Sequence, residues 1–263
     1  MSAKKGPAEI SVITITWNNL PGLMHTLESV QNQTFGAVQH IVIDGSSSDG
    51  TQDFLRQYSP RKPFIAISEP DDGIYDAMNK GARNSEGAYL MFMNAGDAFA
   101  ASSTLEELAE LLNKVTPMWA FGSSEMHVGD RSTGIHRLPP FAKLRLFTGI
   151  ATVPHQASVV SRELWDRLGG FRTDVGFSAD QEFMMRAWMT SPPLVVDSVI
   201  ARCDDTGISS RNAVGEWARQ AARHRATIPV PILCSPPLNY AVRVGGELFD
   251  RARVAVRSSK LRG

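Results

Sequence analysis

Short apolar runs alternate with amphipathic segments over the first 115 residues of the chain. The runs are rich in β-branched and aromatic residues, a composition typical of buried strands. They read ISVITITW (10–17), QHIVIDGS (39–46), FIAISEP (64–70) and AYLMFMNA (88–95). The pattern therefore predicts four strands in this part of the chain.

Segments with apolar residues at helical spacing follow these runs. They read LPGLMHTLESVQNQ (20–33), SSSDGTQDFLRQY (46–58), IYDAMNKGARNS (74–85) and SSTLEELAELLNKV (102–115). The second helix is expected to begin at Ser48 or Asp49 as N-cap, and the third to end at Gly87. Strands that alternate with helices predict an α/β fold, with a mainly parallel sheet covered by helices on both faces.

The alternation weakens after residue 116. Strands are predicted at WAFGSSEMHV (119–128), HQASVVS (155–161) and PLVVDSVIARC (193–203), and helices at RELWDRLGGF (162–171) and SADQEFMMRAWM (178–189). Residues 129–154 are expected to form a long connection, of the kind that often carries functional loops. These patterns favour one domain over 9–210, with halves 9–115 and 116–210, and a basic helical extension over 211–263.

The net charge of the chain is zero, but basic residues gather at its end. From Arg211 onward there are ten Lys and Arg against three Asp and Glu, a local balance of +7, so the first 210 residues carry −7. A basic helical extension is either a solvated tail or a contact with an anionic membrane surface. Dimerisation is a third role open to it, so a homodimer stays among the expected partners.

Targeting signals are not apparent in the sequence. The start, MSAKKGPAEI, has no apolar core of the signal-peptide type, and no run approaches the length of a transmembrane helix. Only two cysteines occur, Cys203 and Cys234, so a reduced cytoplasmic setting is expected. Attachment to the inner face of the plasma membrane would then be peripheral.

Polar residues stand where the predicted strands end, and ligands bind at such strand ends in α/β sheets. These places hold Trp17 with Asn18, then Asp44, residues 69–72 and residues 94–97. Three of the four contain acids, which suit a divalent cation or ribose hydroxyls. A Rossmann dinucleotide site needs a glycine-rich loop where the chain reads WNNLPG, and a P-loop needs a lysine that GSSSDGT lacks.

Several motifs occur in the order and spacing of a known enzyme family. ISVITITWNN, HIVIDGSSSDGT, SEPDDGIYDAMNKG and YLMFMNAGD resemble the donor half of the family 2 inverting glycosyltransferases, and HQASVVSRELWDRLGGF with SADQEFMMRA resembles the acceptor half. The likeness is strongest to bacterial enzymes that build cell-surface polysaccharides and glycolipids. It implies a single-domain GT-A fold, a UDP-, GDP- or dTDP-sugar donor, a saccharide or lipid-linked acceptor, and Mg²⁺ or Mn²⁺.

The resemblance also implies a nucleotide-sugar site. By position its residues are Thr16, Trp17, Asn18, Asp44, Asp72, Gly73, Asn79, Asn94, Ala95 and Gly96. Each has a structural alternative: Trp17 could be a core aromatic, Asp44 a turn residue, and Asn79 a residue that packs the helix.

Asp97 matches the last acid of the family's D-x-D motif and is the expected metal ligand. The other acids of that motif are replaced by Asn94 and Gly96, so this stretch offers a metal fewer carboxylates than is common in the family. Without the resemblance, Asp97 in NAGD would be a turn residue or cap. His155 and Gln156, in VPHQAS, are expected to contact the acceptor or the phosphates, with His155 as a second metal ligand or a structural residue as alternatives.

Asp180 matches the acid of the family's Glu-Asp base motif, with Ala179 in place of the Glu. A base must take the acceptor's proton in an inverting displacement. The alternative is helix capping, since Ser178-Ala-Asp-Gln is a good capping sequence. The chain has no Q-x-x-R-W motif of processive synthases, so transfer of a single sugar is expected.

Two rival functions remain open on the sequence alone. One is a nucleotidyltransferase that makes sugar nucleotides, which would need a Gly-rich, Arg/Lys-containing loop after the first strand. The other is a non-catalytic nucleotide-sugar-binding protein on the same fold, which the replacements at Asn94 and Gly96 keep open. No nucleic-acid partner is expected.

Overall fold

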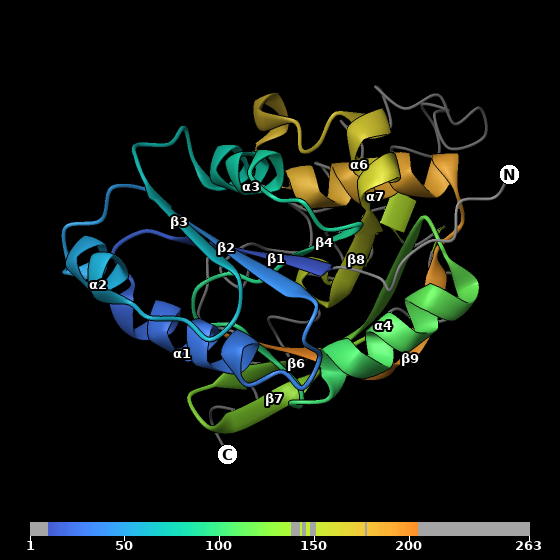
Figure 1. Cartoon of the computed structure of the whole chain (residues 1–263). Coiled ribbons are helices and arrows are strands. Elements are labelled where there is room, and N and C mark those ends of the chain that lie inside the picture. Colours follow the sequence, from blue (N-terminus) through green and yellow to red (C-terminus); the bar gives the residue numbers. More distant parts are fainter. Residues whose placement is uncertain (1–9, 138–142, 144–145, 148–150, 177, 205–263) are drawn as a thin grey trace, which may run out of the picture.

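A computed structural model describes residues 10–137, 143, 146–147, 151–176 and 178–204. In these residues the chain forms a mixed sheet with helices on both faces (Figure 1). The hydrogen-bonded order is β3-β2-β1-β4-β8-β6-β9-β5, and β7 pairs with β6 off this path. This is the predicted mixed α/β sheet.

The strands are β1 (Ile10–Thr16), β2 (Val38–Asp44), β3 (Phe64–Ser68), β4 (Tyr89–Phe92), β5 (Ala98–Phe99), β6 (Trp119–Val128), β7 (Arg131–His136), β8 (Ser158–Ser161) and β9 (Leu194–Asp204). The α-helices are α1 (Leu20–Gln31), α2 (Thr51–Gln57), α3 (Ile74–Arg83), α4 (Thr104–Val115), α6 (Arg162–Leu168) and α7 (Ala179–Thr190), and short 3₁₀ turns cover His155–Ala157 (η1) and Thr173–Val175 (η2).

The first half of the sheet is parallel, as the alternating pattern predicts. β1 pairs in parallel with β2 and with β4, and β2 pairs in parallel with β3. The register places Thr16 opposite Asp44, and Asp44 opposite Ser68. The carboxyl ends of these strands therefore meet at one edge.

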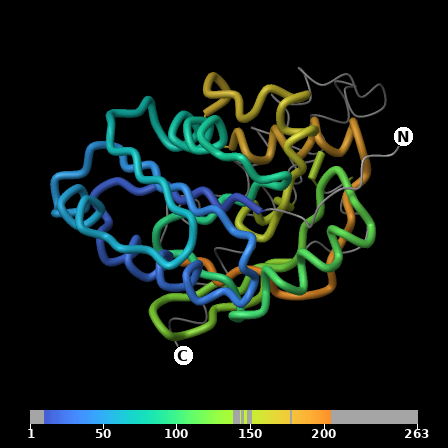
Figure 2. Tube along the Cα trace, in the orientation of Figure 1, coloured from blue at the N-terminus to red at the C-terminus, as the bar shows by residue number. Residues whose placement is uncertain are grey.

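The second half of the sheet is mostly antiparallel. β8 runs antiparallel to both β4 and β6, while β9 runs parallel to β6. Figure 2 shows β9 in orange beside the green β6, far from it in sequence. The predicted connection over 129–154 is wrong in part, because Arg131–His136 form β7, which folds back on β6. The two-residue β5 is too short to give a periodic signal.

Two helix ends differ from the prediction. α2 has Gly50 as its N-cap, with φ of +97°, and the Asp49 carboxylate instead accepts a hydrogen bond from the Thr51 N–H. α3 ends at Arg83 rather than at Gly87, whose N–H donates to the Ser11 hydroxyl. α6 ends at a glycine, because its C-cap Gly169 adopts the left-handed conformation.

The core has two sides because side chains alternate across the sheet. Ile13 and Ile41 face the side of α3, α6 and α7, where Trp165, Phe171 and Phe183 pack together. On the other face, one cluster joins β1 and β4 to α4, and a second joins β2 to α1 and α2. Because helices bury both faces of the sheet, the ends of its strands are held in place, and these ends carry the site.

The basic extension predicted over 211–263 lies outside the described residues, so its helicity stays a prediction. The division into 9–210 and 211–263 likewise stays a prediction. Among the helices that the structure describes, none has the length and apolar character needed to cross a membrane.

Candidate active site

The ends of β1, β2 and β4 bring the first set of predicted residues together. The Ala95 N–H donates to the Ile15 carbonyl, which extends the pairing of β4 with β1 beyond the strand. Since Thr16 is opposite Asp44 on the next strand, Thr16, Asp44 and the loop of residues 94–97 share one edge.

Thr26 of α1 holds the loop of residues 94–97 in place. Its buried hydroxyl lies 2.6 Å from the Asp97 carbonyl oxygen and 3.1 Å from that of Asn94, and it accepts the Gly96 N–H at 3.0 Å. Gly96 has a φ of +106°, a conformation that favours glycine. Asp97 does not cap α4, because Ser103 is the N-cap residue of that helix.

The Asp97 carboxylate is buried, with 5% of the residue exposed. It accepts hydrogen bonds from Gln156 Nε2 at 3.0 Å and from the Asp204 N–H at 3.1 Å. Burial raises the pKa of Asp97 to about 6, and the nearby Asp204 carboxylate contributes to this shift. Sequence reasoning missed Asp204, which ends β9 more than a hundred residues further along the chain.

These residues fit a divalent cation. Asp97 and Asp204 supply carboxylate oxygens, and Asn94 Oδ1 is a buried atom without a hydrogen-bond partner. Mg²⁺ and Mn²⁺ prefer such oxygen ligands and take the remaining positions from water and substrate phosphates. Among the described residues no three His, Cys, Asp or Glu side chains cluster closely enough to hold a metal alone. A cation here would therefore depend on the donor's phosphates.

His155 links this loop to the second predicted acid. Its Nε2 lies 3.3 Å from Asn94 Nδ2, and its Nδ1 lies 3.2 Å from Asp180 Oδ2. A neutral imidazole with its proton on Nδ1 satisfies both contacts, since Nε2 then accepts from the amide. His155 thus connects Asn94, in the predicted donor half, with Asp180, in the predicted acceptor half.

Asp180, in the first turn of α7, is also 5% exposed. Tyr75 Oη donates to its Oδ1 at 2.8 Å, and Gln181 Nε2 donates to its Oδ2 at 2.8 Å. Burial alone would raise the pKa of Asp180, but the hydrogen bonds from His155, Gln181 and Tyr75 outweigh it and hold the pKa below its usual value. The carboxylate is bonded to side chains that surround the site, so it does more than cap a helix.

Trp17 is not a core aromatic, because 71% of it is exposed. It lies beside Gly45: a Cβ at Gly45 would be 3.4 Å from Trp17 Cδ1 and 2.5 Å from Asp71 Oδ2. Asp71, within the predicted strand-end residues 69–72 but not among the predicted site residues, therefore lies against the same backbone as the exposed indole. The ends of β1, β2 and β3 thus bring one exposed aromatic side chain and one carboxylate close together.

Asp44 and Asn18 hold the loops at these strand ends. The fully buried Asp44 carboxylate accepts the Ser47 N–H at 3.1 Å, which is the turn role that its sequence context allows. The Asn18 amide oxygen accepts the Ser48 N–H at 2.8 Å, which ties the loop after β1 to the loop after β2. Thr16 Oγ1 is buried here without a hydrogen-bond partner.

The loop before α3 only partly matches the prediction. Gly73, at a φ of +102°, donates its N–H to Asp71 Oδ1, whereas Asp72 is exposed and its own N–H donates to Asp76. The carboxylate that faces Gly45 is thus one residue earlier than the predicted Asp72, whose nucleoside contact stays a prediction.

Asn79 takes the packing role that was its alternative. Its Nδ2 donates to the Phe171 carbonyl at 2.8 Å, and its Oδ1 accepts the Phe171 N–H at 3.0 Å. Both amide atoms therefore fasten α3 to the turn after α6. These two bonds match the packing alternative, and the contact of Asn79 with a nucleotide sugar stays a prediction.

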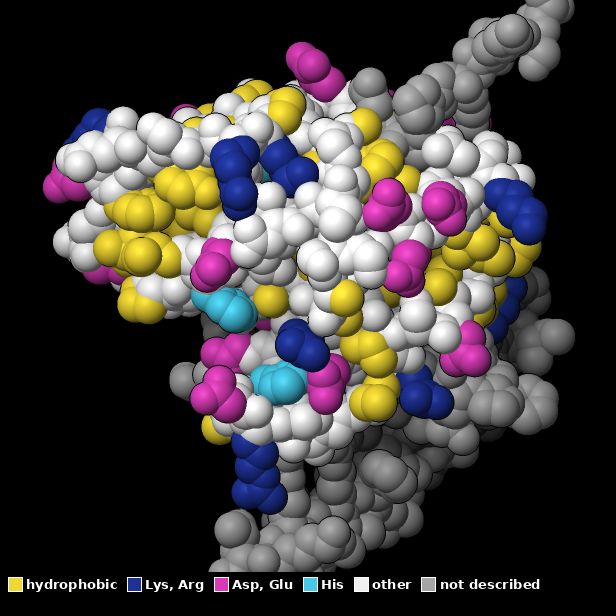
Figure 3. Space-filling model, turned by 60° about the horizontal axis from the view of Figure 1, so that its bottom comes forward, with side chains coloured by type: hydrophobic (Ala, Val, Ile, Leu, Met, Phe, Trp, Pro, Cys, Tyr) yellow, Lys and Arg dark blue, Asp and Glu magenta, His cyan; other side chains and the backbone are white. Residues whose placement is uncertain are grey.

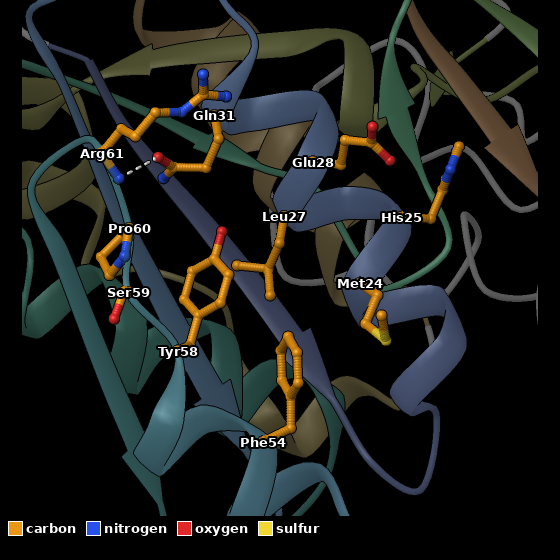
Figure 4. Close-up of a pocket in the computed structure, with 10 residues that line it drawn as sticks. All are labelled: Met24, His25, Leu27, Glu28, Gln31, Phe54, Tyr58, Ser59, Pro60 and Arg61. Carbon is orange, nitrogen blue, oxygen red and sulfur yellow. Dashed lines mark hydrogen bonds between the residues drawn. The ribbon is translucent and has the colours of Figure 1, made fainter.

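A separate pocket of about 570 Å³ lies between α1 and the segment that follows α2 (Figure 4). Leu27, Phe54 and Tyr58 form its apolar part, and Gln31 bonds the Arg61 N–H at its rim. In the view of Figure 3 one group of apolar side chains lies at the left, and further apolar side chains lie among the charged ones across the rest of the face. None of the predicted site residues lines this pocket, so we assign it no part in the chemistry at the strand ends.

Comparison with known proteins identifies the family. The model of the family described as "Glycosyl transferase family 2" matches residues 11–168. The chain belongs to this family, and it is a glycosyltransferase with the GT-A fold.

Relatives and solved structures agree with this assignment. An "uncharacterized glycosyltransferase" of Mycobacterium tuberculosis H37Rv is 36% identical over 227 residues, which cover 82% of this chain and 84% of that one. A "PGL/p-HBAD biosynthesis glycosyltransferase" of Mycobacterium bovis is 30% identical over 70% of this chain and 71% of its own. The structure of S. aureus TarS with UDP-GlcNAc has a TM-score of 0.68 at 16% identity, covering 89% and 70% of the two chains.

A second solved structure is a mannosyltransferase from Pyrobaculum calidifontis in complex with GDP-Man and Mn²⁺. It has a TM-score of 0.64 at 20% identity, and the match covers 97% of this chain and 76% of that one. Both structural likenesses are below 25% identity, so they show the fold.

Proposed function

We propose that the chain is a metal-dependent inverting glycosyltransferase that moves one sugar from a nucleotide-sugar donor to an acceptor hydroxyl. One observation carries the proposal: His155 connects the acid-bearing loop after β4 with the buried carboxylate of Asp180. A site for a departing diphosphate and a base thus lie on either side of one imidazole. The nucleotide-sugar complexes of the two solved structures support a UDP- or GDP-sugar donor, and a dTDP-sugar stays a candidate.

The strand ends that carry Trp17, Gly45 and Asp71 would hold the nucleoside. Trp17 would stack on the base or ribose, and the Asp71 carboxylate would accept hydrogen bonds from it. The buried hydroxyl of Thr16, which has no partner, would find one in the donor.

Asp97, Asp204 and Asn94 would hold a divalent cation together with the donor's diphosphate. When bound, Mg²⁺ or Mn²⁺ supplies positive charge to the departing phosphate oxygen. The Mn²⁺ in the mannosyltransferase complex supports this choice of ion. Gln156, bonded to Asp97, orients its carboxylate.

Asp180 would act as the base. The acceptor oxygen attacks the anomeric carbon from the face opposite the diphosphate, and its proton passes to the carboxylate as the new C–O bond forms and the sugar–phosphate bond breaks. The lowered pKa of Asp180 keeps the carboxylate ionised at neutral pH, the form that accepts a proton. A one-step displacement of this kind inverts the anomeric configuration.

The acceptor is proposed to be a saccharide or lipid-linked saccharide of the cell envelope. The relative named for PGL/p-HBAD biosynthesis supports this choice. Peripheral contact of the basic 211–263 segment with the cytoplasmic face of the membrane would bring the enzyme to such an acceptor.

Donor hydrolysis tests the proposal without a known acceptor. The purified chain is incubated with UDP-, GDP- and dTDP-sugars in Mn²⁺, Mg²⁺ or EDTA, and release of the nucleoside diphosphate is measured. We expect release from one donor class that depends on the metal and is lost in Asp180→Asn and Asp97→Asn. Equal release in EDTA would contradict metal dependence, and full activity of Asp180→Asn would remove the base assignment alone.

A further inference from the structure

Asp180 is held by three side chains from three parts of the fold. Gln181 and His155 both reach Oδ2, whereas Tyr75 of α3 is the one side chain among the described residues that donates to Oδ1. A carboxylate oxygen has two lone pairs, so Oδ2 is fully used and Oδ1 keeps one. Oδ1 is therefore the oxygen that can take a proton from a substrate.

Tyr75 is held at both ends of its side chain. Its ring packs on Phe171, with a centroid separation of 5.4 Å. Its hydroxyl donates to Oδ1 of Asp180 at 2.8 Å, and this bond joins α3 to the first turn of α7. The ring contact and the hydrogen bond together fix where the phenol meets the carboxylate.

The phenol remains a donor throughout the working pH range. Burial and the adjacent Asp180 carboxylate raise the pKa of Tyr75 well above its ordinary value, so the hydroxyl stays protonated. A charged carboxylate accepts a short hydrogen bond from a neutral donor, and such charge-assisted bonds are stronger than neutral ones.

The position preceding the base is also informative. Ala179 is fully buried and carries no polar group, and Glu182, one turn further along α7, is paired with Arg186. No acid next to Asp180 in the sequence is therefore available to orient it. That work falls to side chains from other elements.

We propose that Tyr75 is the positioning residue of the base: its hydroxyl aims Oδ1 of Asp180 at the acceptor hydroxyl. This inference rests on the proposed role of Asp180. Tyr75 takes no proton itself; the acceptor proton passes to Oδ1 while the phenol keeps its own. Loss of the phenol would leave the carboxylate free to turn and would remove a bond that favours its charged form.

Tyr75→Phe removes the hydroxyl and keeps the ring. In donor hydrolysis at saturating metal, we expect kcat to fall about tenfold with KM for the donor unchanged. The acid limb of the pH profile of kcat should move to higher pH, because the Asp180 carboxylate loses a hydrogen bond that lowers its pKa. Tyr89→Phe is the matched control: it loses a hydrogen bond to the Pro117 carbonyl away from the site and should leave the profile unchanged.

Asp180→Asn in the same assay separates the two claims. If no donor is hydrolysed, the proposed function fails. If Asp180→Asn keeps its activity, the base assignment is wrong, and the positioning role of Tyr75 is wrong with it. If Asp180→Asn is inactive while Tyr75→Phe keeps the wild-type kcat and pH profile, the positioning role alone is wrong. The pKa of Asp180, followed by carbon NMR of the labelled carboxyl, gives a substrate-free check: it should rise in Tyr75→Phe, and an unchanged value would overturn the inference.

Discussion

The hydroxyl of Thr26 lies 2.6 Å from the carbonyl oxygen of Asp97, and both groups are buried. This contact joins the middle of α1 to the loop that carries the proposed metal ligand. The same hydroxyl accepts the Gly96 N–H, so one side chain organises the backbone on both sides of the Gly96–Asp97 peptide.

Thr26→Val tests how much the hydrogen bonds of this hydroxyl contribute, because valine has nearly the same shape and cannot form them. The buried Gly96 N–H would lose one acceptor and keep only its bond to Gly22. We expect the free energy of unfolding to fall by about 1–3 kcal/mol, measured by urea denaturation. The rate of metal-dependent donor hydrolysis should also fall, by more than the fraction of unfolded protein accounts for. Thr34→Val, at an exposed threonine, is the control and should change neither quantity.

Asp97→Asn should make the metal-free protein more stable at pH 8. The pKa of Asp97 is raised to about 6 in the folded chain, so folding favours the protonated form, and the charged form costs stability above that pH. Removing the charge should add about 1–3 kcal/mol to the free energy of unfolding in EDTA. The wild type should lose this amount as the pH rises from about 4 to 6, and the variant should not.

The activity of Asp97→Asn should be lost in the same preparation. Asp53→Asn, at an exposed acid of α2, serves as the control for a change of charge. A variant that is both less stable at pH 8 and still active with metal would contradict the proposed role of Asp97.

His40 should weaken the fold in acid. It is buried in β2, where Thr14 Oγ1 lies 2.9 Å from its Nε2, and burial lowers its pKa to about 3. The unfolded chain takes up this proton near pH 6.5 and the folded chain does not, so stability falls as the pH drops below that value. The contribution should be about 1.4 kcal/mol per pH unit between about 6.5 and 3. In His40→Gln the free energy of unfolding should no longer show this dependence on pH, whatever the stability of the variant at pH 7. If the variant shows the same slope as the wild type, His40 is protonated in the folded chain.

Trp17 should matter for donor binding and little for the fold, because most of its surface is exposed. Stacking of a base on an aromatic side chain contributes about 1–3 kcal/mol. Trp17→Ala should therefore raise KM for the donor by about 5- to 150-fold, with kcat and the melting temperature nearly unchanged. Trp17→Phe should recover part of the loss. A large drop in melting temperature would instead show that the indole is a packing residue.

The strands that carry the site could be predicted from the sequence, because each is a short apolar run ending in polar residues. That pattern located Thr16, Asp44 and the loop of residues 94–97 at one edge. It could not give the antiparallel arrangement of the second half, since pairing of β8 with β4 and β6 depends on contacts far apart in sequence.

Residues missed by sequence reasoning share one property: their partners are distant in the chain. Thr26 and Tyr75 are in helices, where nothing local distinguishes them from ordinary half-buried positions. Asp204 reaches Asp97 only through β9. Asp71 and Asp72 both belong to the predicted strand-end residues 69–72, and two adjacent acids offer no signal for which one turns inward. Gly45, which leaves room for a carboxylate, selects Asp71 in the structure.

Calorimetric titration of the full chain with UDP, GDP and dTDP, in Mn²⁺ and in EDTA, tests the central claim most directly. We predict that one nucleoside diphosphate binds in Mn²⁺ and that EDTA weakens its affinity by about tenfold or more, equal to at least about 1.4 kcal/mol. Absence of binding by all three, or equal affinity in Mn²⁺ and EDTA, would contradict a metal-dependent donor site at Asp97.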